Sequence, residues 1–123
     1  MTSPVRGDVS ALLGDIERIL DSYRRSWPAM KWACLLYEDG TPATFPEDPA
    51  KAALVERIVS ESPDVEYGEL HFEDEHLYFM RTEQGFYLCV ATDPSAKTGI
   101  VRLVLRSIAR DLAPLLNSLR EWG

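Results

Sequence analysis

The loop Asp93–Gly99 is the part of the chain that most invites comparison with a catalytic motif, because Lys97 and Thr98 lie beside its glycine. In nucleotide-binding P-loops a Lys-Ser/Thr pair follows the stretch Gly-x₄-Gly, whose backbone N–H groups cradle the phosphates. Here the Lys-Thr pair precedes the glycine instead of following it. The chain is therefore not expected to be a GTPase itself. We expect the loop to connect a strand to a helix that Ser95 or Thr98 caps.

Two histidines, His71 and His76, flank the acidic run Glu73-Asp74-Glu75. Imidazole nitrogens and carboxylate oxygens are ligands that several divalent metals accept. Alternate residues of a hairpin point to opposite faces, however, so these side chains need not converge. The pattern favours solvated turn residues, with no metal site and no cofactor. A pH-sensitive contact through the two histidines stays open as an alternative.

The sequence offers little for nucleophilic catalysis. Cys34 and Cys89 lie in apolar runs without a C-x-x-C motif, so they are expected to be reduced thiols in the core. No serine lies in a Gly-x-Ser-x-Gly elbow. The neighbouring carboxylates fall in runs on turns rather than at convergent positions. We therefore expect no catalytic residue and a regulatory or binding module rather than an enzyme.

Length and composition favour one globular domain. The chain has 123 residues, of which 46% are hydrophobic and 27% charged, with a net charge of −7. An acidic protein is a poor ligand for nucleic acids and for anionic membranes. The first residues lack the apolar stretch of a signal peptide, and no apolar run reaches membrane-spanning length, which favours a cytoplasmic protein. We expect a flexible tail over residues 1–7 and a single domain over residues 8–123.

Apolar periodicity and turn residues predict the order α-β-β-α-β-β-β-α. Expected helices start at Asp8 or Ser10, at Asp48 as a cap with Pro49 in first position, and near Ile100. Pro114 is expected to kink the last of them. The expected strands are Met30–Tyr37, Thr41–Phe45, Glu69–Glu73, His76–Arg81 and Phe86–Thr92. The predicted fold class is α+β, a five-stranded antiparallel sheet with the first and last helices on one face and the middle helix on the other.

The closing segment carries a resemblance to a known family. A strand is followed by Asp93, five residues, Gly99-Ile100-Val101-Arg102-Leu103 and then the final helix. This order, together with the Asp39-Gly40 turn and the element order over about residues 8 to 113, resembles the roadblock family. The resemblance implies a roadblock/profilin-like fold. It also implies a non-catalytic dimer that regulates or scaffolds a small Ras-like GTPase. By similarity to gliding-motility regulators of the family, it implies stimulated GTP hydrolysis by that partner.

The resemblance also implies where partners bind. Roadblock subunits join through the third strand and the helix before it, which here predicts a dimer interface of Val55, Ile58, Val59, Leu70, His71 and Phe72. A second copy and a basic paralogue both remain open as the other subunit, and acids on the strand could instead prevent pairing. The expected GTPase-binding surface is the middle helix, with Lys51, Glu56, Arg57 and Glu61.

Two other classes of protein remain as alternatives. One is an acidic dimeric chaperone that resembles type III secretion chaperones, which have three strands before the middle helix. The other is a small-ligand sensor of longin, profilin or PAS-like shape, which needs an internal cavity. The number of strands before residue 48 distinguishes the chaperone from the roadblock hypothesis.

Overall fold

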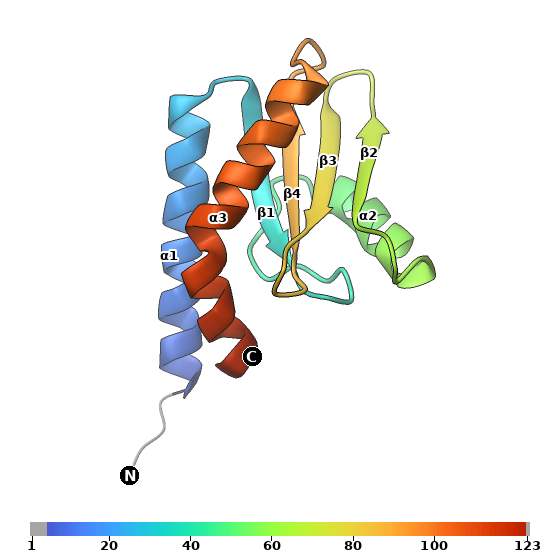
Figure 1. Cartoon of the computed structure of the whole chain (residues 1–123). Helices are drawn as coiled ribbons and strands as arrows, with labels where there is room; N and C mark the ends of the chain where they lie inside the picture. Colours follow the sequence, from blue (N-terminus) through green and yellow to red (C-terminus); the bar gives the residue numbers. More distant parts are fainter. Residues whose placement is uncertain (1–4, 123) are drawn as a thin grey trace.

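The computed structural model describes residues 5–122, which form three helices and one four-stranded antiparallel sheet. The sheet order is β1-β4-β3-β2, so β1 and β2 are its two edges. Figure 1 shows α1 and α3 side by side on one face and α2 on the other. In chain order the elements are α1 (Val5–Ser26), β1 (Met30–Leu36), α2 (Pro49–Glu61), β2 (Tyr67–His71), β3 (His76–Arg81), β4 (Tyr87–Thr92) and α3 (Thr98–Trp122).

Strand periodicity divides the core into two halves. Because successive strand residues point to opposite faces, Leu88 and Val90 pack under α1 and α3 while Tyr87 and Cys89 pack under α2. The α1/α3 half is completed by the buried stripe of α3, namely Val101, Leu105, Ile108, Leu112, Leu116 and Leu119. The expected placement of the three helices therefore agrees with the structure.

The expected second strand, Thr41–Phe45, does not form. Only an isolated bridge joins Leu36 to Pro42, so the described sheet has four strands where five were expected. Pro42 has no N–H for a ladder, and the Thr44 hydroxyl, rather than a carbonyl, accepts the N–H of Leu35 at 2.9 Å. Phe45 then leaves the sheet, with 89% of its surface exposed.

The helix ends differ from expectation at two places. Helix α1 begins at Val5, so Asp8 and Ser10 lie inside it and neither is its cap. Residues 1–4 of the expected tail lie outside the described residues. At α3 the Ser95 hydroxyl donates to Asp93 at 2.6 Å, and Thr98 is the first helical residue. The Ser95 side chain therefore organises the loop, and neither expected residue is the cap of the helix.

The predicted start of α2 is confirmed. Asp48 caps α2 by accepting the N–H of Lys51 at 3.2 Å, with Pro49 in first position as expected. Helix α3 continues through Pro114 to Trp122. Beyond the proline, Leu116 and Leu119 are fully buried against the α1/α3 half of the core. The last turns of α3 therefore dock on the domain.

Strand β2 lies two residues earlier than the expected Glu69–Glu73. A glycine explains the shift: a Cβ on Gly68 would lie 2.3 Å from the ring of Phe79, so only glycine lets β2 close over this aromatic side chain. The alternation of acidic and apolar residues over Glu69–Glu73 gave no indication of this contact between Gly68 and Phe79.

Candidate functional site

The outer edge of β2 offers unpaired backbone groups. The N–H of Phe72 donates to the carbonyl of Glu75, and the N–H of Arg81 donates to that of Glu66. Hydrogen-bonded pairs alternate with non-hydrogen-bonded pairs in an antiparallel ladder. The register then makes Tyr67, Glu69 and His71 the non-hydrogen-bonded residues, whose N–H and C=O groups point away from β3. Since β2 is the last strand of the sheet, these groups face outward.

Apolar side chains border this edge on the α2 face. Leu70 and Phe72 of the β2 hairpin are half-buried against the α2 core, as is Ile58. One turn before Ile58, Leu54 is 42% exposed. An exposed leucine beside an open strand edge is a candidate contact for a second subunit. Sequence reasoning missed Leu54 because it followed the buried stripe of the helix, although its position four residues before Ile58 was a usable signal.

Val55 and Val59, both expected at the dimer interface, lie instead in the chain's own core. They are 0% and 2% exposed and pack with Phe79 and Tyr87 under the sheet. A second subunit cannot reach them while α2 stays docked. The structure therefore brings together Ile58, Leu70 and Phe72 of the expected interface and places the two valines behind them.

Lys51, expected to bind a partner, holds the domain together. Its ammonium lies 2.9 Å from Glu75 and 3.0 Å from Asp74, and it lies 4.8 Å from the centre of the Phe72 ring. The carboxylate of Glu75 is buried and also accepts the indole N–H of Trp32 at 3.3 Å. The hydrogen bond to Glu75 raises the pKa of Lys51. This network ties α2, β1 and the β2–β3 turn together.

The other expected partner-binding residues lie on α2, and two of them are exposed. Arg57 and Glu61 form an i,i+4 ion pair at 3.2 Å with both side chains exposed. Glu56 packs against the turn at Gly40, where an added Cβ would lie 2.8 Å from its Cα. The positive φ of Gly40, 90°, therefore lets the β1 turn approach α2 closely.

A polar strip follows the opposite face of β2. The Tyr67 hydroxyl donates to Glu69 at 2.8 Å, and the same carboxylate lies 3.0 Å from His71. His71 stacks on His76 with ring centres 3.9 Å apart, as expected for a non-hydrogen-bonded pair with close side chains. Burial and the bond to Glu69 raise the pKa of Tyr67 to about 12, and the Tyr67 bond lowers the pKa of Glu69.

Two further expectations concern metal ligands and the two cysteines. Among residues 9–122, whose side chains the structure describes, no group of three or more His, Cys, Asp or Glu could hold a metal ion. Cys34 and Cys89 are cross-strand partners, both buried as free thiols. The hydrogen bond to Cys34, together with burial, raises the pKa of the Cys89 thiol well above its usual range. Such a thiol is a weak nucleophile.

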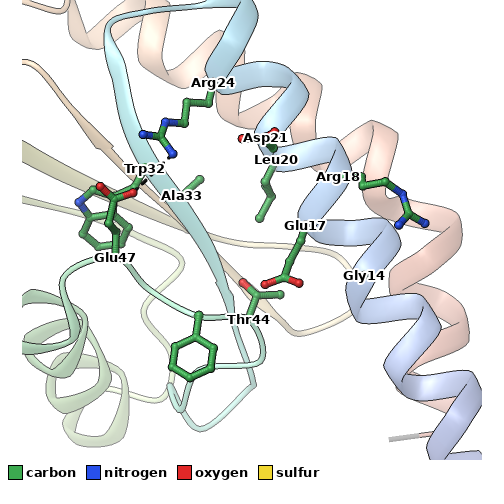
Figure 2. Close-up of a pocket in the computed structure, with 11 residues that line it drawn as sticks. Gly14, Glu17, Arg18, Leu20, Asp21, Arg24, Trp32, Ala33, Thr44 and Glu47 are labelled. Atoms are coloured by element: carbon green, nitrogen blue, oxygen red, sulfur yellow. Dashed lines mark ion pairs between the residues drawn. The ribbon is translucent and has the colours of Figure 1, made fainter.

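The β1 edge is sheltered by contrast with β2. Segment 41–45 satisfies Leu35, whose carbonyl accepts the N–H of Ala43 at 2.8 Å. Beyond it a groove of about 520 Å³ separates β1 from α1 (Figure 2). Ala33 lies on its floor, and an ion pair at 3.5 Å joins Arg24 of α1 to Glu47 of the opposite wall. Any strand that approached this edge would have to pass the α1 wall.

Comparison with known proteins gives matches in shape but not in sequence. No family model and no curated protein matches the chain. Myxococcus xanthus MglB matches with a TM-score of 0.68 and 17% identity, over 87% of this chain and 91% of that one. The chain has the roadblock fold. A Roadblock/LC7 domain from Streptomyces avermitilis has a TM-score of 0.54 and 17% identity, over 86% and 95% of the two chains.

A third roadblock structure covers still more of the chain. The gliding protein MglB from Thermus thermophilus matches 96% of this chain and 95% of its own, with a TM-score of 0.56 and 14% identity. At these identities the likeness is one of fold, which confirms the resemblance inferred from the closing segment. No helix within residues 5–122 is long and apolar enough to cross a membrane.

Proposed function

We propose that this roadblock domain is a non-catalytic regulator that dimerises through the β2 edge and binds a small Ras-like GTPase. The observation that carries the proposal is the open edge of β2, where Tyr67, Glu69 and His71 present backbone groups beside an exposed apolar border. Antiparallel pairing of two such edges would satisfy these groups and extend one sheet across two subunits. The GTPase as partner rests on the resemblance to the roadblock family.

The proposed dimer interface consists of the β2 backbone together with Leu54, Ile58, Leu70 and Phe72. These side chains lie around the strand edge on the α2 face, where the helices of two subunits would meet. Glu69 would approach its copy across the two-fold axis, but its carboxylate already accepts bonds from Tyr67 and His71. Like charges opposite each other destabilise a strand pair, and these two hydrogen bonds offset part of that cost.

The proposed GTPase-binding surface is the solvent side of α2. Arg57 and Glu61 are exposed there, with Glu56 beside them. Lys51 supports this surface through its ion pairs and is a positioning residue in the proposal. The chemistry of hydrolysis stays in the GTPase. This protein would accelerate hydrolysis by ordering the switch loops of its partner.

The chaperone alternative has no support in the described strands. It requires three strands before the middle helix, whereas the structure has β1 alone before α2. The sensor alternative requires an internal chamber. The largest cavity described, about 1160 Å³, is instead a surface groove with Glu38, Glu83 and Arg120 among its lining residues.

Light scattering coupled to size-exclusion chromatography tests the proposal. The chain is run alone and mixed with small Ras-like GTPases of its organism, each loaded with GDP or with a non-hydrolysable GTP analogue. We expect a dimer that co-elutes with a GTPase in the analogue-bound state. Arg57→Glu should abolish co-elution, whereas Arg25→Glu, an equal charge change on α1, should leave it intact. A monomer that binds no GTPase in either state would contradict the proposal.

A further inference from the structure

Helix α3 carries a basic ridge that the proposed dimer and GTPase surfaces do not use. Arg102, Arg106 and Arg110 recur at four-residue steps and so lie on one face of the helix. The Arg102 guanidinium lies over the ring of Tyr67, 4.4 Å from its centre. Like charges one turn apart repel each other, so such a ridge is unfavourable unless other groups neutralise it.

The last two arginines of the ridge have few neutralising contacts. Arg106 makes no side-chain hydrogen bond or ion pair with any side chain of residues 9–122, the part whose side chains the structure describes. Arg110 donates to the Ser107 hydroxyl at 3.3 Å and lies 3.9 Å from its neighbour Asp111, a long contact between exposed groups. The carboxylate of Asp111 also accepts the Tyr23 hydroxyl. The chain has a net charge of −7, so two weakly paired arginines on one helix face form a basic patch on an otherwise acidic protein.

A cavity of about 360 Å³ opens between this part of α3 and the β3–β4 turn. Arg106 and Arg110 line it, together with the small side chains of Ala109 and Ala113 and the apolar Met80. The turn contributes Thr82, Glu83 and Gln84. Glu83 is the one acid among these lining residues, and within the described chain no ion pair joins it to either arginine. The cavity is therefore basic on the α3 side and apolar in between.

A buried hydroxyl in the same cavity lacks a partner. Thr82 is 6% exposed, and its Oγ1 makes no hydrogen bond. Strand alternation places Thr82 on the same face as Tyr78 and Met80, which is the α3 face of the sheet. Buried hydroxyls are normally paired, because water is no longer there to satisfy them. That oxygen has almost no exposed surface, so a ligand's acceptor oxygen would become the missing partner only once the side chains over it move.

We propose that this groove binds an extended acidic segment of another protein, with carboxylates at alternate residues. Arg106 and Arg110 are separated by a helix rise of about 6 Å. Side chains on the same face of an extended chain repeat every ~7 Å, which matches that step. Each guanidinium can bind a carboxylate through two parallel hydrogen bonds. The Thr82 hydroxyl would donate to one of the carboxylates.

The apolar part of the groove distinguishes a peptide from a simple oxyanion. Ala109, Ala113 and Met80 can cover the CH₂ groups of glutamate side chains, for which a free phosphate has no counterpart. The groove lies on the α1/α3 face, and the proposed GTPase surface lies on the α2 face (Figure 1). Both partners could therefore be bound at once, as a scaffold requires.

Fluorescence anisotropy with a dye-labelled, end-capped peptide of alternating glutamate and threonine tests the site on the full chain at low ionic strength. We expect the Arg106→Ala/Arg110→Ala variant to bind at least about tenfold more weakly, because charge-assisted hydrogen bonds are lost. Arg25→Ala/Arg120→Ala removes the same charge elsewhere and should change affinity less than about twofold. Thr82→Val should also weaken binding while keeping the fold, as circular dichroism would verify.

Three outcomes would overturn the proposal. The wild-type chain could fail to bind the peptide. The two double variants could weaken binding equally, which would indicate non-specific charge attraction. Inorganic phosphate could displace the peptide at concentrations equal to those of the peptide itself, which would indicate a simple oxyanion site.

Discussion

The two edges of the sheet end in different ways. At β1, the segment after the strand returns and satisfies Leu35. The carbonyl of Leu35 accepts the N–H groups of Ala43 and Thr44, and its N–H donates to the Thr44 hydroxyl. At β2, the chain turns directly into β3 and leaves Tyr67, Glu69 and His71 unpaired on the outer side. One edge is therefore closed by the chain itself, and the other keeps its outward backbone groups open, as the proposed dimer requires.

The side chains around the two edges also differ: those around β1 cover its edge, and those around β2 do not. The β1 edge lies behind a groove whose walls are joined by the Arg24–Glu47 ion pair. The β2 edge is bordered by Leu54 and Ile58 of α2, with no helix of the described chain in front of it. Natural sheets seldom leave a long apolar edge unprotected, because such edges associate. The contrast between the two edges is the basis for the proposed dimerisation through β2.

The substitution with the largest expected effect on the difference between the two edges is Glu69→Pro. Its N–H points outward, so Glu69→Pro keeps the β2–β3 ladder but removes one hydrogen bond from each side of a two-fold interface. We expect the dimer dissociation constant to rise at least about a hundredfold. Sedimentation equilibrium measures this, with Glu69→Gln as the control that keeps the N–H. A proline variant that dimerises like wild type would place the interface elsewhere.

A methyl group at Gly68 tests how β2 is held on the sheet. Gly68→Ala puts a Cβ against the ring of Phe79, and such overpacking should lower the free energy of unfolding by about 1–3 kcal/mol. Gly14→Ala, on the α1 wall of the β1 groove, meets only the end of Arg18 at 3.9 Å and should raise it by about 0.5–1 kcal/mol. Urea unfolding of both variants gives the comparison. Equal effects would contradict the close approach at β2.

A loss of the Thr44 hydroxyl tests the closed edge. Thr44→Val leaves the N–H of Leu35 buried without an acceptor, which should lower the free energy of unfolding by about 1–2 kcal/mol. The oligomeric state should not change, because β1 is not the proposed interface. Thermal unfolding and light scattering on the same sample check both expectations. Dissociation of the dimer on this substitution would count against the assignment of the two edges.

The smallest expected effect is on acid stability. The Tyr67 hydroxyl lowers the pKa of Glu69 below its ordinary value of 4.5, and the Thr41 hydroxyl lowers that of Asp39 below 3.8. Carboxyls with a lowered folded-state pKa stabilise the fold at higher pH, and this contribution is lost as pH falls through the folded pKa. When unfolding is measured from neutral to acid pH, the free energy of unfolding should fall less for Glu69→Gln than for the wild-type chain. Only the Glu69 effect should depend on protein concentration.

The sequence predicted the parts of this account that local chemistry determines. The Asp48-Pro49 start of α2, the turn at Gly40 and the helix placement follow from caps, glycines and periodicity. The resemblance of the closing segment led to the fold. The prediction of a strand over Thr41–Phe45 was wrong. Pro42 has no N–H for a ladder, the Thr44 hydroxyl accepts the N–H of Leu35, and the chain then leaves the sheet at Phe45.

The candidate site was harder to predict, because it depends on which side of α2 faces the sheet. Val55 and Val59 were expected at the dimer interface, but they lie in the chain's own core, and a buried face cannot also be an interface. The sequence suggests that Lys51 is an exposed charge. Its ammonium is instead hydrogen-bonded to Asp74 and Glu75, which lie more than twenty residues later in the chain. The unpartnered Thr82 hydroxyl has no sequence signal at all, since its surroundings come from α3.

Residue-resolved hydrogen exchange as a function of protein concentration tests the central claim most directly. The amides of Tyr67, Glu69 and His71 face outward on β2, and the amide of Ala33 faces outward on β1, two residues from Leu35. We predict that the three β2 amides gain protection as concentration rises through the dimer range, while Ala33 exchanges at a constant rate. Unchanged exchange of the β2 amides, or protection that appears at Ala33 instead, would contradict the account.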